Sequence, residues 1–132
     1  MFKFELEKEV KVNNHKKVSV QTTTVDKLCE GFDGTVFIWA DIEGAELRML
    51  RGATELLSSG RVLGLNLELW PQNAQKIWPH YTGNRCTADQ VIDFLAQYDM
   101  ECRGSLPKPN LVYGDFESQD WFQDFLFVRE DL

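Results

Sequence analysis

A strand, a helix and a second strand follow one another across residues 35–69, and this unit constrains the fold more than any other feature of the chain. Residues 35–40 (TVFIWA) form an apolar run typical of a buried strand. Residues 45–60 repeat apolar side chains at helical spacing and end in Ser-Ser-Gly, where glycine commonly stops a helix. Residues 61–70 (RVLGLNLELW) then alternate leucine with Gly, Asn and Glu, as a strand does. This succession predicts two parallel strands joined by a crossover helix, the unit of an open α/β sheet.

The flanking segments are expected to extend this sheet within a single domain, residues 1–132. Residues 1–22 alternate apolar and charged side chains around an Asn-Asn pair, which predicts an N-terminal β-hairpin. Short helices are expected over 25–30 and, behind a Thr-x-x-Gln capping box, over 87–98. Further strands are expected near 101–105 and 121–129. We therefore expect an α/β sheet that is mostly parallel, with an antiparallel last strand.

Composition excludes several functional classes. The net charge of −7 argues against nucleic acid, which requires a basic face. No apolar run approaches the length of about 20 residues that crosses a bilayer, so no membrane partner is expected. Three cysteines, Cys29, Cys86 and Cys102, form an odd set with no close pair, which is typical of reduced thiols. We expect a cytoplasmic protein.

Acidic residues follow both strands of the strand–helix–strand unit. Asp41 and Glu43 come directly after the first strand, Gly44 leads into the helix, and Glu68 lies at the end of the second strand. Ligands of open α/β sheets bind outside the carboxyl ends of the strands, so these carboxylates are expected to face one crevice. A plainer interpretation stays open, in which Asp41 and Glu46 are ordinary helix-start residues and Glu68 an ordinary strand residue.

The motif FIWADIEGAELRMLRGA, with SVQTTTVDKL before it and LELWP after it, resembles the carboxyl-terminal half of FkbM-type methyltransferases. These enzymes use S-adenosylmethionine and commonly methylate hydroxyl groups of sugars and secondary metabolites. The resemblance covers about residues 18–129 and implies part of a Rossmann-like methyltransferase sheet. Trp39 departs from the family, which often has lysine two residues before the first acid of the motif.

The resemblance implies roles for individual residues. Methyl transfer to a hydroxyl requires the removal of one proton, so a carboxylate or histidine near the acceptor oxygen is expected. The candidate catalytic residues are Asp41, Glu68 and His80. The candidate cofactor-binding residues are Asp41, Glu43 and Gly44, and the candidate acceptor-binding residues are Glu68, Trp70, Trp78 and Tyr81. The aromatic residues could instead pack only against their own loop. A divalent ion would suit the carboxylates, but a metal-free site is expected.

The chain shows no glycine-rich turn between a strand and a helix, which a Rossmann-like fold uses to bind its cofactor. We therefore expect a fragment that lacks the donor-binding half, neither binds S-adenosylmethionine nor acts alone, and takes a small hydroxylated acceptor. The alternative is a non-catalytic α/β module that binds a ligand or a protein. Without the missing half, the first strand of the unit, residues 35–40, would have an unpaired edge unless the N-terminal hairpin or a second copy covers it, and we expect a homodimer.

Overall fold

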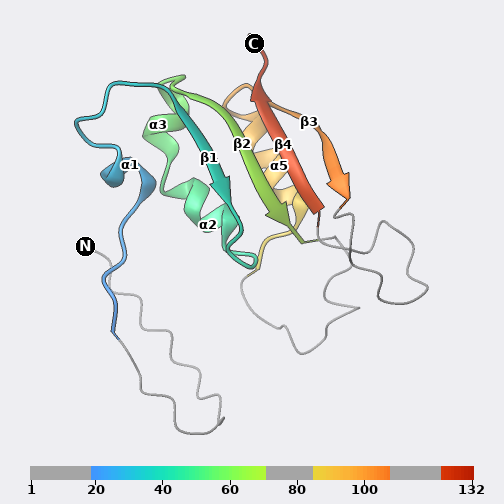
Figure 1. The fold of residues 1–132 in the computed structure, drawn as a ribbon, viewed down its shortest axis with the longest axis horizontal. Helices are drawn as coiled ribbons and strands as arrows, with labels where there is room; N and C mark the ends of the chain where they lie inside the picture. The colour runs from blue at the N-terminus through green and yellow to red at the C-terminus, as the bar shows by residue number, and fades with distance from the viewer. Residues whose placement is uncertain (1–18, 71–84, 108–122) are drawn as a thin grey trace, which may run out of the picture.

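The computed structural model describes residues 19–70, 85–107 and 123–132, which form a sheet with helices against it (Figure 1). In chain order the helices and strands are α1 Val25–Leu28, β1 Val36–Ala40, α2 Glu46–Arg51, α3 Thr54–Ser58, β2 Val62–Leu69, α5 Ala88–Ala96, β3 Met100–Pro107 and β4 Gln123–Arg129. The strand–helix–strand unit expected between residues 35 and 69 is present.

The sheet has four strands in the order β1-β2-β4-β3. Strands β1 and β2 are parallel, as predicted. The last strand, β4, runs antiparallel to both of its neighbours, β2 and β3, which confirms its predicted direction. The prediction of a mostly parallel sheet is wrong at the level of strand pairs, since only β1–β2 is parallel among the described pairs. The reason is that β4 inserts between β2 and β3 and makes both of its pairs antiparallel, although β1, β2 and β3 share one direction.

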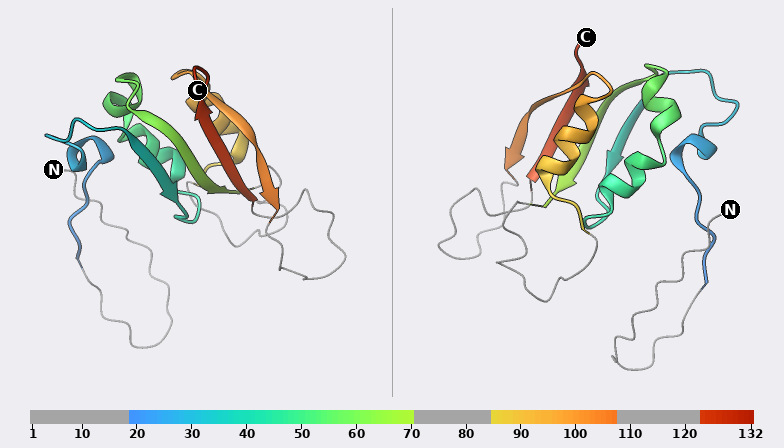
Figure 2. Two further views of the ribbon diagram at one scale, coloured as in Figure 1. Left: turned by 45° about the horizontal axis from the view of Figure 1, so that its top comes forward. Right: turned by 180° about the vertical axis from the view of Figure 1, so that it is seen from behind.

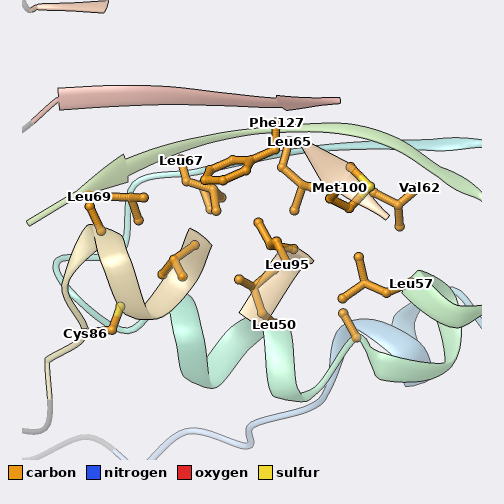
Figure 3. Close-up of a cluster of buried hydrophobic side chains, with 14 of the residues drawn as sticks. Leu50, Leu57, Val62, Leu65, Leu67, Leu69, Cys86, Leu95, Met100 and Phe127 are labelled. Carbon is orange, nitrogen blue, oxygen red and sulfur yellow. The ribbon is translucent and has the colours of Figure 1, made fainter. Parts of the chain in front are cut away.

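The hydrophobic core lies between one face of the sheet and the helices. Viewed from behind, α2, α3 and α5 lie across that face (Figure 2, right). The side chain of Phe127 points from β4 toward the helices, alongside the leucines of β2 (Figure 3). The largest fully buried apolar side chains are Phe127, Leu50, Leu65, Leu67, Leu69, Leu95, Val62 and Val91. Their removal from water is the main force that holds the helices on the sheet.

The expected helix over residues 45–60 is divided into α2 and α3 around Gly52. Helix α1 explains the break, because the backbone N–H of Asp26 donates to the carbonyl of Gly52 at 2.9 Å. The carboxylate of Asp26 then accepts the N–H groups of Glu55 at 3.1 Å and Leu56 at 2.9 Å, at the start of α3. A side chain from another helix thus caps α3 and fixes the position of the break. Gly60 follows α3 with a φ of 74°, the conformation of a glycine that ends a helix.

The predicted caps of the other two helices are present. The Thr24 hydroxyl accepts the N–H of Lys27 at 3.1 Å, although α1 ends at Leu28, two residues earlier than expected. The capping box that opens α5 is formed, with the Gln90 side chain accepting the N–H of Thr87 at 3.1 Å. Within the described parts of the chain, no helix is long and apolar enough to cross a membrane.

The opposite face of the sheet carries exposed apolar side chains. Phe37 and Trp39 on β1 are 56% and 78% exposed, and Leu126 on β4 is 37% exposed. Trp39, Asn66 and Leu126 occupy one cross-strand row. Strand β1 lies at the end of the strand order, and no strand covers its outer edge among the residues described. The predicted N-terminal hairpin falls mainly on residues 1–18, outside the described residues, and residues 19–24 form no strand.

Candidate functional site

Three carboxylates meet at the carboxyl ends of β1 and β2. The two strands are paired up to Ala40 and Leu67, so Asp41 and Glu68 follow at adjacent positions. Asp41, Glu43 and Glu68 each offer one carboxylate oxygen, and these oxygens all lie within 4.8 Å of one another. The first two side chains are exposed, whereas Glu68 is only 9% exposed. The convergence expected from parallel strands is therefore present, and we call these three residues the acidic cluster.

The acidic cluster can bind positive charge or donate lone pairs to hydroxyl hydrogens. Carboxylates at this separation repel one another, and a cation or hydrogen-bond donor placed between them relieves that repulsion. Oxygen ligands of this kind suit a divalent cation such as Mg²⁺ or Ca²⁺, but exposed acidic groups are common without one. The expectation of a metal-free site stays a prediction, as do the catalytic roles of Asp41 and Glu68.

The loop that carries two of these acids has an unusual backbone. Glu43 and Gly44 have φ angles of 55° and 90°, both in the left-handed region. Gly44 is buried, and a β-carbon added to it would lie 2.8 Å from the Cβ of Arg85. Glycine is therefore required here both by its backbone conformation and by the packing of Arg85. Arg85 occupies the space in which a side chain at position 44 would lie. The contact of Gly44 with the cofactor stays a prediction.

Trp70 closes the end of β2 and is 4% exposed. The guanidinium carbon of Arg85 lies 4.4 Å from the centre of a Trp70 ring, a cation–π contact. The carbonyl of Trp70 accepts the N–H of Ala88 at 3.0 Å, which ties β2 to the start of α5. The sequence pattern did not point to Arg85, whose only local signal is its position two residues before the capping box.

Glu46 lies beneath the loop and is fully buried. One of its carboxylate oxygens accepts the N–H of Ile42 at 3.1 Å, and the other accepts the Cys86 thiol at 3.5 Å. Burial raises the pKa of the Cys86 thiol, the N–H of Leu47 opposes this shift, and the charge of Glu46 adds to it. From sequence, Glu46 was interpreted either as a helix-start residue or, by the resemblance, as part of the motif beside the cofactor and the acceptor. Its burial gave no local signal.

Three further candidate residues belong to the segment that follows β2. His80, Trp78 and Tyr81 lie in the segment 71–84, outside the described residues.

A groove of about 570 Å³ lies at the opposite, amino-terminal end of β1 and β2. Its lining comes from α1, the turn that follows it, and α3. Four of the charged side chains that line the groove have partners, namely those of Asp26, Lys27, Glu30 and Arg61. Asp26 caps α3, Lys27 pairs with Glu30, and Arg61 donates to the carbonyls of Phe32 and Gly34. We assign this groove to packing between elements and place the candidate site at the acidic cluster.

Comparison with known proteins adds one match. The sequence model of one family, described as the methyltransferase FkbM domain, matches residues 3–102. This range contains β1, α2, α3, β2 and α5 together with the whole acidic cluster, and it ends inside β3. No curated protein and no solved structure matches the chain.

Proposed function

The chain belongs to the FkbM methyltransferase family, and we propose that it forms the acceptor-side, carboxyl-terminal half of an S-adenosylmethionine-dependent O-methyltransferase. The acceptor in this proposal is a small molecule with a free hydroxyl, such as a sugar or a secondary metabolite. The observation that carries the proposal is the acidic cluster at the carboxyl ends of the parallel strands β1 and β2, the position where open α/β sheets bind ligands.

The residues around the cluster suit one end of the methyl donor. S-adenosylmethionine carries its transferable methyl group on a positively charged sulfonium, and Asp41 and Glu43 offer exposed negative charge. The adenosine end requires a glycine-rich turn between a strand and a helix. Within the described residues, the turn from β1 to α2 contains only Gly44, which is buried against Arg85. The fit therefore extends to the transfer end of the donor, and the adenosine contacts must come from outside the described residues.

The carboxylates would act on the acceptor. Asp41 and Glu68 lie close enough to share one hydroxyl group, which either could orient by accepting its hydrogen bond. One of them would take the proton as the oxygen is methylated. Glu68 is buried in the sheet and would orient the hydroxyl, whereas the exposed Asp41 can pass a proton on to solvent.

The test is methyl transfer by a protein that joins this chain to a donor-binding segment of the family, measured as S-adenosylhomocysteine release with a panel of hydroxylated acceptors. Asp41→Asn and Glu68→Gln are expected to lower kcat by roughly 10²-fold or more, the usual effect of losing a general base. Donor affinity should change little. Glu55→Gln, an exposed acid on α3, is the matched control. Unchanged kcat in both variants would refute the assignment of Asp41 and Glu68 to the acceptor. Loss of donor affinity would instead assign the two carboxylates to donor binding.

A non-catalytic binding module is the second candidate, favoured by the exposed Phe37 and Trp39 on the sheet face that none of the described helices covers. It predicts no S-adenosylhomocysteine release from the joined protein with any acceptor.

All three cysteines are free, which suits the cytoplasmic location that we include in the proposal.

A further inference from the structure

Glu46 is a fully buried carboxylate that the proposed chemistry does not use. A carboxylate removed from water is costly unless hydrogen bonds replace its hydration. Both of its oxygens have such a partner, and the two partners belong to different segments of the chain. Ile42 lies in the loop after β1, and Cys86 lies just before α5.

The bond to Ile42 holds the loop of the acidic cluster at its centre, since Ile42 stands between Asp41 and Glu43. Inside the loop, the N–H of Ala45 donates to the carbonyl of Ile42 at 3.2 Å. Ala45, the residue before α2, makes no side-chain cap, and two consecutive residues of the loop adopt positive φ angles. Backbone of this kind persists only where surrounding contacts fix it.

Cys86 fixes the same loop from the other side. Its N–H donates to the carbonyl of Gly44 at 3.0 Å. Its sulfur accepts the N–H of Leu47 at 3.4 Å, one of the helix-start donors that have no partner inside α2. Cys86 is 5% exposed, and its side chain lies against the core beside α2 (Figure 3). Glu46 and Cys86 thus make three hydrogen bonds to the loop and the first turn of α2, and a fourth hydrogen bond joins the two residues to each other.

We propose that Glu46 and Cys86 are positioning residues, which hold Asp41 and Glu43 in place against Glu68. They act through the backbone of Ile42 and Gly44 and do not contact the acceptor. Their effect on catalysis rests on the proposed function, whereas their effect on the loop does not.

The first experiment measures amide hydrogen exchange by NMR in the ¹⁵N-labelled chain. In Glu46→Ala, exchange at Ile42 should become about tenfold faster relative to the sheet amide of Leu67. The reason is that the Ile42 amide can then reach solvent without first breaking its hydrogen bond to the Glu46 carboxylate. Glu46→Gln keeps an oxygen for the Ile42 N–H and should restore slow exchange. Glu55→Gln is the control for loss of an acid. Unchanged exchange at Ile42 in Glu46→Ala, or no recovery in Glu46→Gln, would overturn the proposal.

Cys86 is tested in the same way through the amide of Leu47. Cys86→Ala removes the acceptor and should accelerate exchange at Leu47, while Cys86→Ser keeps a smaller acceptor and should give an intermediate rate. Normalising to Leu67 separates this local change from any loss of global stability. Equal rates at Leu47 in all three proteins would exclude Cys86 from the positioning role.

The second experiment is the methyl-transfer assay in the joined protein. Glu46→Ala should lower kcat with little change in the KM for the donor, and Glu46→Gln should recover most of it. If Ile42 responds as expected but Asp41→Asn and Glu68→Gln leave transfer intact, the proposed function fails while the loop-positioning role stands. If the Asp41 variant loses transfer but Glu46→Ala neither frees Ile42 nor lowers kcat, the positioning proposal fails and the proposed function stands.

Discussion

The carboxylate of Asp26 accepts the backbone N–H of Leu56 at 2.9 Å, across thirty residues of sequence. Its second oxygen accepts the N–H of Glu55, so one side chain of α1 caps the start of α3. Asp26→Ala should therefore lower the free energy of unfolding by about 1 to 2 kcal/mol, as the loss of a helix cap does. Urea denaturation gives the value. Asp33→Ala, at an exposed acid in the turn after α1, should have little effect, and equal losses in both variants would contradict the capping role.

Phe127 and Leu126 are neighbours on β4 that face opposite sides of the sheet. Phe127 is fully buried among the helices, whereas Leu126 is 37% exposed on the other face. Phe127→Ala should cost about 3 to 5 kcal/mol of stability, because it removes a core side chain and leaves a cavity. Leu126→Ala is the matched control and should cost less than about 1 kcal/mol. Similar denaturation midpoints for the two variants would contradict the burial of Phe127 in the core.

The raised pKa of Cys86 predicts a specific dependence of stability on pH. The folded protein binds the thiol proton more tightly than the unfolded chain, whose thiol has its ordinary pKa of 9.0. The stabilisation is therefore fully present below that value and is lost as pH rises through the raised pKa of the folded state. Relative to Cys86→Ser, the wild-type chain should lose stability more steeply above about pH 9. Denaturation series at several pH values test this, with Cys29→Ser as control; parallel curves for the wild type and Cys86→Ser would refute it.

No described strand pairs with the outer edge of β1, and this edge together with the exposed aromatic side chains of β1 predicts a homodimer. A strand edge with free N–H and C=O groups can pair with a second copy, and Trp39 and Phe37 add apolar surface beside it. Light scattering at high protein concentration should show the dimer. Trp39→Lys should shift it toward monomer, whereas Leu28→Lys, at another exposed apolar residue, should not. A monodisperse monomer of the wild-type chain would count against this prediction.

The isolated chain is expected to show no measurable binding of S-adenosylmethionine. The described residues offer carboxylates near the transfer end but no glycine-rich turn for the adenosine. Each missing hydrogen bond to a charged group is worth roughly 1.5 to 3 kcal/mol, so a few of them weaken binding by orders of magnitude. Calorimetric titration provides the measurement. Saturable binding in the micromolar range would show that the chain holds its donor by other contacts.

Much of the fold was predictable because its signals are local. The apolar run of β1, the alternation in β2 and the capping box of α5 each lie within a few residues, and each element is present. The break between α2 and α3 was not predictable, since the side chain that causes it comes from Asp26. The insertion of β4 between β2 and β3 likewise depends on pairing between distant segments.

The candidate site divides in the same way. The convergence of Asp41 and Glu68 follows from two parallel strands joined by one crossover, which the sequence pattern indicates. The burial of Glu46 was not foreseeable, because its thiol partner is forty residues away. The same applies to Arg85, which reaches Gly44 and Trp70 from the far side of the segment 71–84.

The central place of β4 also sets the order in which the molecule can assemble. During synthesis β1, α2, α3 and β2 can fold together as soon as they emerge, since their contacts are close in sequence. Strand β3 pairs only with β4 in the described sheet, so it has no partner there until β4 has been made. Until then β2 keeps one unpaired edge as well. Strands β2 and β3 therefore both lack this partner until β4 has been synthesised, and a chaperone would be of most use in that interval.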